Sequence, residues 1–255
     1  MLKDINFVRE NVKKALELYL NDSPKDISFK SSFDLVTEID KNIEGFLNSK
    51  IKEAYPNDNI VSEETRPDEM MKGRCWTVDP IDGTLNMVHN IKLFGVQVSL
   101  FENEEPLLSY VYFPVLKEEY YAYRGGGCFH NGEKVGVKVE AFENAILSIG
   151  DFSHTNKSNS ERQYRGLEQL YKSFSRVRMF GSAALDYACV ACGKTQACMV
   201  ITKNLWDVLP GYILCKEAGA FLCNLKGGPY KIGDDGLIAA ANKELADRIV
   251  TSLKE

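Results

Sequence analysis

The sequence predicts a fold of mixed α+β and α/β character, built from two halves. Three stretches of different texture support this prediction. Apolar residues recur with a helical period up to about Ala54, and short β-rich runs punctuated by glycine then extend to about residue 140. From about Ala141, strand-like and helix-like segments alternate. This order is typical of an antiparallel α+β part followed by an α/β part, so we expect domains at 1–140 and 141–255.

Two amphipathic helices are predicted before the first strands of the N-terminal half. The first has apolar residues at helical spacing from Ile5 to Tyr19 and ends before Ser23-Pro24. The second extends from about Ile39 to Ala54, because the following Tyr55-Pro56 disfavours further helix. Thr37 and Asp40 are expected where a loop becomes this second helix.

The β-rich part is expected to form an antiparallel sheet with hairpin connections. Gly125-Gly-Gly127 and Asn131-Gly132 are typical turn sequences between its strands. The predicted strands are Ile60-Val61, Cys75 to Val78, Phe94 to Phe101, Leu107 to Phe113 and Glu119 to Tyr123.

The C-terminal half is expected to alternate strands with helices. The predicted strands are Ile146 to Ile149, Arg176 to Phe180, Ala197 to Ile201 and Leu237 to Ala240. The predicted helices are Asn159 to Phe174, Ser182 to Cys192, Asp207 to Ala218 and a last one from Lys243.

Composition excludes several classes of protein. A net charge of -5 and a pI near 5.4 give no basic field for a nucleic-acid backbone. No apolar segment predicts a membrane span, and the charged first 20 residues do not resemble a signal peptide. Seven cysteines, an odd number, indicate a reducing compartment, so we expect a cytoplasmic protein. From the charge and the lack of a membrane span, we expect no nucleic-acid and no membrane partner. Cys189-Val-Ala-Cys192 is interpreted as a pair of buried thiols on a helix.

The stretch Trp76 to Asn86 carries the most chemical information. A strand delivers Asp79 at its end, Pro80 fixes the backbone, and Asp82 follows after one apolar residue. Two carboxylates held this close repel each other unless a proton or cation lies between them, and hard oxygen ligands suit Mg²⁺. Taken alone, the stretch is more simply interpreted as an acidic surface turn.

Three further features strengthen the hypothesis of a phosphate site. Gly83-Thr84 offers backbone N–H groups at a helix start, where anions commonly bind. Glu63 follows a short apolar strand, and Asp207 begins an apolar helix that has Pro210 in its first turn. Singly, Glu63 fits a solvated loop and Asp207 a helix cap.

Together these pieces resemble the inositol monophosphatase family, in order and over nearly the whole chain. The resemblance rests on Lys30 to Asp40, Ser62-Glu-Glu64, Trp76 to Asn86, Gly181-Ser-Ala-Ala184 and Trp206-Asp207 with Glu217-Ala-Gly219. It implies a layered αβαβα sandwich of the inositol monophosphatase and fructose-1,6-bisphosphatase type. It also implies a phosphoric monoester hydrolase that acts on a small phosphate ester, depends on two to three Mg²⁺ ions, is sensitive to lithium and forms a homodimer.

The resemblance assigns roles residue by residue. Glu63, Asp79 and the Ile81 carbonyl would hold one Mg²⁺, and Asp79, Asp82 and Asp207 a second. Glu63 and Thr84 would orient the attacking water, with Asp40 behind Thr84. The substrate would be bound by the following residues: Ile81, Asp82, Gly83, Thr84, Gly181, Ser182, Ala183 and Asp207. Lys30 would help to hold the loop over the site.

Substrate choice stays open at this level. Inositol monophosphate or a related sugar or polyol phosphate is expected, but fructose 1,6-bisphosphate and 3′(2′),5′-bisphosphate nucleotides use the same metal core. Val200 stands where animal relatives have a glutamate that binds inositol hydroxyls, and an apolar side chain cannot satisfy a polyol. A non-catalytic regulatory protein is the alternative from another class.

Overall fold

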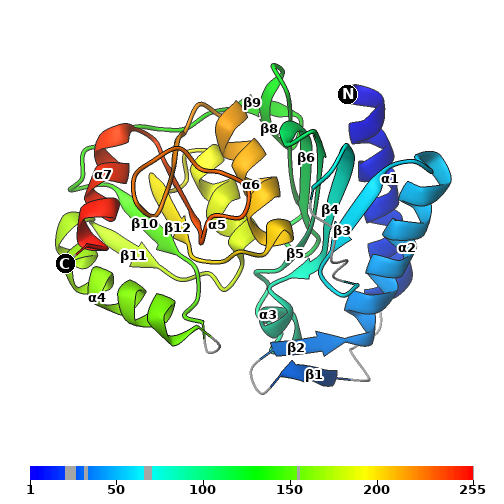
Figure 1. Cartoon of the computed structure of the whole chain (residues 1–255), viewed down its shortest axis with the longest axis horizontal. Coiled ribbons are helices and arrows are strands. Elements are labelled where there is room, and N and C mark those ends of the chain that lie inside the picture. Colours follow the sequence, from blue (N-terminus) through cyan, green and yellow to red (C-terminus); the bar gives the residue numbers. More distant parts are fainter. Residues whose placement is uncertain (21–26, 32–33, 66–70, 154–155, 255) are drawn as a thin grey trace.

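Five alternating layers of helix and sheet make up the molecule. The computed structural model describes residues 1–20, 27–31, 34–65, 71–153 and 156–254, with the side chains of 27–36 left out. Helices α1 (Leu2–Tyr19) and α2 (Glu38–Ala54) cover one side of a first sheet. Helices α5 (Ala183–Ala191) and α6 (Leu205–Glu217) lie between the two sheets, and α4 (Lys157–Ser173) and α7 (Lys243–Ser252) cover the far side of the second (Figure 1). The expected αβαβα sandwich is confirmed.

The first sheet has seven strands among the described residues. Their order is β3 (Asn59–Ser62), β4 (Arg74–Asp82), β5 (Gly95–Glu102), β6 (Glu105–Phe113), β7 (Glu118–Tyr123), β8 (Gly127–His130) and β9 (Glu133–Val135). All neighbours are antiparallel except β3 and β4, which run parallel. Because β3 and β4 are parallel, both end at the same edge, and this edge carries Glu63 and Asp79.

The second sheet is mixed and belongs to the C-terminal part of the chain. Its order is β11 (Arg176–Arg178), β10 (Ile146–Ile149), β12 (Ala197–Val200), β14 (Leu237–Ala240) and β13 (Phe221–Asn224). Strand β10 is parallel to both of its neighbours, whereas β14 is antiparallel to β12 and β13. Two smaller elements, the antiparallel pair β1 (Ile27–Ser31) and β2 (Asp34–Thr37) and the short helix α3 (Thr84–Val88), lie below the first sheet in Figure 1.

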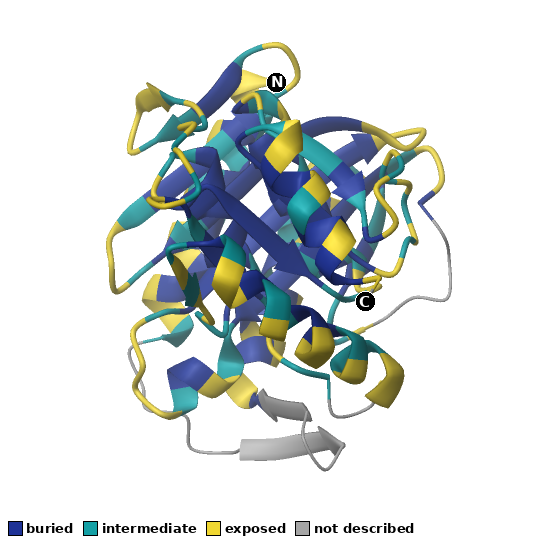
Figure 2. Cartoon of the chain, turned by 90° about the vertical axis from the view of Figure 1, so that its left-hand side faces the viewer, coloured by how far each residue is buried: buried dark blue, intermediate teal, exposed yellow. Residues whose placement is uncertain are grey.

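The hydrophobic core is continuous across the two halves. One cluster joins β4 to β8 of the first sheet with α5, α6 and strands of the second sheet, and it includes Phe113, Tyr120, Tyr187 and Leu214. Figure 2 views the molecule from the side of α4 and α7, where outward faces are exposed and the strands behind them are buried. The chain passes from the first sheet to the second between Val135 and Ile146, and the two halves share this central core. The division into domains at 140 and 141 stays a prediction.

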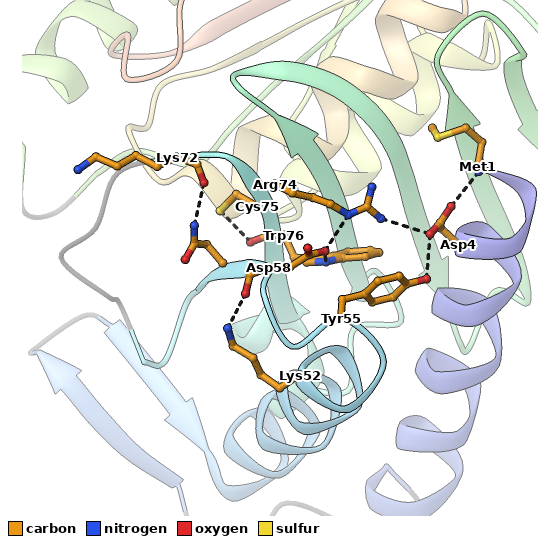
Figure 3. A network of polar contacts seen from close by, with 10 residues as sticks. Met1, Asp4, Lys52, Tyr55, Asp58, Lys72, Arg74, Cys75 and Trp76 are labelled. Atoms are coloured by element: carbon orange, nitrogen blue, oxygen red, sulfur yellow. Dashed lines mark hydrogen bonds and ion pairs between the residues drawn. The ribbon is translucent and has the colours of Figure 1, made fainter.

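A polar network fastens the two N-terminal helices to β4 (Figure 3). Arg74 on β4 donates from Nε to Asp58 at 2.8 Å and pairs through Nη2 with Asp4 of α1 at 3.3 Å. The indole of Trp76 also donates to Asp58, at 2.7 Å, and the hydroxyl of Tyr55 donates to Asp4 at 2.8 Å. The buried carboxylate of Asp58 therefore serves two donors from one strand.

Most predicted elements are present with ends shifted by a few residues. The strand expected from Arg176 to Phe180 ends at Arg178, and residues 179–182 instead lead into α5. Strands β1, β2 and β13 and the pair β8–β9 were not predicted as elements, although the glycines around β8 were recognised as turns. All seven cysteines are free, with Cys189 buried and Cys192 partly buried on and after α5.

Candidate active site

The end of β4 places two carboxylates on one short, irregular segment. Pro80 has no N–H for the ladder, and the pairing of β4 with β5 shifts register between Asp79 and Asp82. The segment stays buried through this irregularity. The side chains of Asp79 and Asp82 consequently leave the sheet next to the start of α3.

Four acids from three segments line one pocket of about 220 Å³. Glu63 follows β3, Asp79 and Asp82 end β4, and Asp207 lies in the first turn of α6. The lining is completed by Ile81, Gly83, Thr84, Leu85, Asp151 and Gly181. The Asp207 carboxylate, more than 120 positions along the chain from Asp82, thus shares a pocket with it, as the sequence hypothesis required.

Asp79 is the most confined of the four acids. Its side chain is 1% exposed; Oδ2 accepts a hydrogen bond from Gln97 Nε2 at 3.0 Å, whereas the buried Oδ1 has no partner among the described residues. Burial raises the pKa of Asp79 well above its ordinary value, and the nearby charges of Glu63, Asp82 and Asp207 raise it further. A carboxylate in this position needs a proton or a cation.

Asp82 joins the first sheet to the helix layer between the sheets. Oδ1 accepts from the backbone N–H of Ala183 at 3.1 Å and Oδ2 from that of Ala184 at 3.0 Å, and the hydroxyl of Ser182 also donates to Oδ2. Burial raises the pKa of Asp82 to about 6, although these hydrogen bonds lower it. Asp82 therefore stabilises the N-terminus of α5 while its carboxylate still borders the pocket.

Asp207 is positioned by the loop before α6. Its Oδ2 accepts from Asn204 Nδ2 at 3.0 Å and, more weakly, from Thr202 Oγ1 at 3.4 Å. Burial raises its pKa well above the ordinary value, and the charges of Glu63 and Asp82 add to the effect. The four acids thus act on one another electrostatically.

Thr84 connects the pocket to the start of α2. Its Oγ1 lies 2.9 Å from Asp40 Oδ1 and 2.9 Å from the carbonyl oxygen of Ile81, either of which can accept its proton. The other oxygen of Asp40 accepts from the backbone N–H and the hydroxyl of Thr37 in a capping box. Asp40 is 1% exposed and lies behind Thr84 rather than in the lining.

Two glycines allow the backbone from the two halves to meet at the pocket. Gly83 has φ of +85°, and a Cβ there would lie 3.0 Å from the Leu93 carbonyl oxygen and 3.1 Å from that of Gly181. The side-chain amide of Asn86 donates to the carbonyls of Leu93 and Phe180, both at 2.8 Å. A side chain at position 83 would force this contact apart.

Some of the predicted site residues line the pocket, and others lie behind the residues that line it. Gly181 lines the pocket, whereas Ser182 and Ala183 lie behind Asp82 and donate to it, so their contact with substrate stays a prediction. Sequence reasoning missed Leu85 and Asp151 in the lining. The segment 30–36 is outside the residues whose side chains are described, and the role expected for Lys30 falls there.

The donor set fits a hard divalent cation. Across the described ranges, no three acidic, histidine or cysteine side chains close into a ready-made metal cage. Asp79 nevertheless lines a pocket of oxygen ligands, and its buried Oδ1 has no hydrogen-bond partner within the described part of the chain. A bound Mg²⁺ would relieve the mutual repulsion of these acids. The residues able to hold such ions are Glu63, Asp79, Asp82, Asp207 and the carbonyl of Ile81.

Comparison with known proteins agrees with this geometry. The sequence profile of the inositol monophosphatase family matches residues 3–255. The inositol-1-monophosphatase of Bacillus subtilis is 34% identical over 215 residues, which cover 83% of this chain and 80% of the relative. The fructose-1,6-bisphosphatase/inositol-1-monophosphatase of Thermotoga maritima is 36% identical, over 76% of this chain and 73% of that protein.

A solved structure shows the same architecture. The structure of a Thermotoga maritima IMPase superposes with a TM-score of 0.89 at 29% identity, covering 99% of this chain and 97% of that one. The layered fold, the acids around one pocket and the full-length sequence match point to one conclusion. The chain belongs to the inositol monophosphatase family.

Proposed function

We propose that this chain is a Mg²⁺-dependent phosphomonoesterase that hydrolyses inositol monophosphate or a related sugar or polyol phosphate. Its family makes it a phosphatase of small phosphorylated metabolites. The observation that carries the proposal is the pocket in which Glu63, Asp79, Asp82 and Asp207 meet beside Thr84. Its volume of about 220 Å³ suits a small ester, since pockets for drug-sized ligands measure roughly 300 to 1,000 Å³.

The metal ligands are proposed as two overlapping sets. Glu63, Asp79 and the Ile81 carbonyl would hold one Mg²⁺, and Asp79, Asp82 and Asp207 a second, so that Asp79 would belong to both sets. A third, weaker ion near Glu63 is part of the proposal. Bound Mg²⁺ would neutralise the phosphate, lower the pKa of a coordinated water and stabilise the leaving oxygen.

The protein's own groups would position the reactants. When the Thr84 hydroxyl donates its proton to Asp40 or to the Ile81 carbonyl, its lone pairs are free to accept from a water in the pocket. Glu63, which also lines the pocket, would accept a hydrogen bond from the other O–H of that water. Gly83, Thr84 and Gly181 would border the phosphate, and the walls would hold it for in-line attack.

A substrate panel tests the proposal directly. Purified protein is assayed with Mg²⁺ against inositol 1-phosphate, a hexose 6-phosphate, fructose 1,6-bisphosphate and adenosine 3′,5′-bisphosphate, with EDTA and Asp79→Asn as negative controls. We expect Mg²⁺-dependent release of phosphate, fastest from a monophosphate. Preference for a bisphosphate would favour the alternative substrates, and no turnover at any Mg²⁺ concentration would favour a non-catalytic regulatory role.

Other expectations from the family can be checked on the same protein. Inhibition by Li⁺ at roughly tens of millimolar would support occupation of a metal position. We also propose a cytoplasmic homodimer, to be measured by light scattering after gel filtration. Among the described residues, no helix combines the length and apolar character that crossing a membrane requires.

A further inference from the structure

A fifth acid borders the pocket from the second sheet. Asp151 follows β10, whose pairing with β12 continues beyond the strand through a hydrogen bond from Gly150 N to the Met199 carbonyl at 2.9 Å. Asp151 therefore leaves the second sheet at the ends of two parallel strands. The other four acids come from the first sheet and α6.

The neighbouring strand end offers no polar group. Val200, the last residue of β12, is 5% exposed and is not part of the pocket lining. A Cβ on Gly150 would lie 3.4 Å from Val200 Cγ1, so the two strand ends are in contact at this point. Of the residues at these two strand ends, Asp151 lines the pocket and Val200 does not.

The carboxylate of Asp151 is available to a ligand. Its side chain is exposed, and among the described residues it has neither a hydrogen bond nor an ion pair. It lines the same pocket as Asp82 and lies close enough to it for their charges to interact. An ionised carboxylate is purely an acceptor, with room for several donors.

We propose that Asp151 selects the alcohol part of the substrate, accepting hydrogen bonds from the hydroxyls of an uncharged polyol and repelling a second phosphate. This inference rests on the proposed phosphatase function and narrows it to monophosphates of neutral polyols or sugars. A carboxylate that gains hydroxyl donors is stabilised, whereas a second phosphate beside it adds like charge. Bisphosphates are therefore poor substrates of this chain.

Two changes at this position separate the effects of hydrogen bonding and charge. Asp151→Asn keeps the shape and removes the charge, and Asp151→Lys reverses the charge. The matched control is Asp247→Asn, an exposed acid on α7 that pairs with Lys243 and does not line the pocket. Steady-state kinetics with saturating Mg²⁺ are measured on inositol 1-phosphate and fructose 1,6-bisphosphate.

We expect Asp151→Asn to lower kcat/KM for inositol 1-phosphate about tenfold, mainly through KM, because hydroxyl contacts stabilise bound substrate and transition state alike. The value for the bisphosphate should rise several-fold, and more in Asp151→Lys, while Asp247→Asn leaves both unchanged. If the ratio of the kcat/KM values for the two substrates stays within twofold of that of the unmodified enzyme, the inference about Asp151 is overturned and the proposed function is not. An equal loss on both substrates that extra Mg²⁺ restores also overturns it, since Asp151 would then be a metal ligand. No turnover by the unmodified enzyme overturns the proposed function as well.

Discussion

Thr84 Oγ1 lies 2.9 Å from Asp40 Oδ1, so a pocket hydroxyl is tied to a buried carboxylate at the start of α2. The other oxygen of Asp40 already accepts two hydrogen bonds from Thr37. The position of Asp40 is therefore held by Thr37 independently of its contact with Thr84. The Thr84 hydroxyl thus has two acceptors within reach, the Ile81 carbonyl and a carboxylate held by a helix cap.

Removing the hydroxyl should cost activity without unfolding the protein. Thr84 is only partly buried, so Thr84→Ala is expected to lower kcat about 10- to 100-fold with little change in melting temperature, because the attacking water loses its acceptor. Thr84→Ser keeps the hydroxyl and should retain most of the activity. Equal losses in the two variants would show that the methyl group, and not the hydroxyl, matters.

Asp79→Asn should stabilise the metal-free protein and abolish its response to Mg²⁺. An asparagine can still accept from Gln97, and it removes a negative charge on which the charges of three other acids act. We expect a melting temperature a few degrees higher without metal, no further rise with Mg²⁺, and at least about 100-fold lower activity. Thermal scans with and without Mg²⁺ measure the effect; a lower melting temperature without metal would contradict it.

Asp58 should be the most sensitive residue of the network in Figure 3. Asp58→Ala leaves the indole N–H of Trp76 and the guanidinium of Arg74 without their common acceptor. The expected loss in free energy of unfolding is about 2 to 4 kcal/mol. Denaturant titration provides the measurement, with Glu53→Ala, an exposed acid on α2, as the control that should change stability little.

Glu119 should make stability depend on pH in the acid range. Burial acts to raise its pKa, but hydrogen bonds from Lys13, Arg9 and Tyr110 outweigh burial and hold the pKa below the ordinary value of 4.5. A lowered native pKa gives stability that is present above pH 4.5 and is lost as pH falls through the native value.

The corresponding variant is Glu119→Gln. Its deficit in unfolding free energy should be greatest near neutral pH and shrink on acidification below about pH 4.5. Glu10→Gln, at an exposed acid on α1, provides the comparison. A deficit independent of pH would mean that the shape of Glu119, and not its charge, stabilises the contact with α1.

The periodicity of apolar residues and the turn residues were sufficient to predict the long helices and strands. The helices α1 and α2 bury regular apolar stripes, and β5 and β6 are long, so local pattern and tertiary structure agree. The strand β13 escaped prediction because Phe221–Asn224 is short and only partly buried, and pairing with β14 defines it. The pair β1–β2 likewise depends on a register that single-sequence patterns do not reveal.

Site residues that belong to a sequence motif could be predicted. Residues that reach the pocket only because of the fold could not. Asp79, Asp82 and Asp207 belong to recognisable signatures and line one pocket. Asp151 carries no signature, and only the alignment of β10 with β12 brings it to the wall. The carboxylate of Glu217 accepts from Gly125 N and Gly127 N, both at 3.1 Å, which gives the Glu-Ala-Gly signature a structural role that its sequence did not indicate.

Helix α6 carries Asp207 in its first turn and Glu217 at its last residue, about 15 Å further along the axis at 1.5 Å per residue. One end borders the pocket, and the other holds the glycine turn between β7 and β8. A displacement of this rod along its axis would move both ends by the same amount. The spacing of the acids is thereby mechanically linked to a distant turn on the rim of the first sheet.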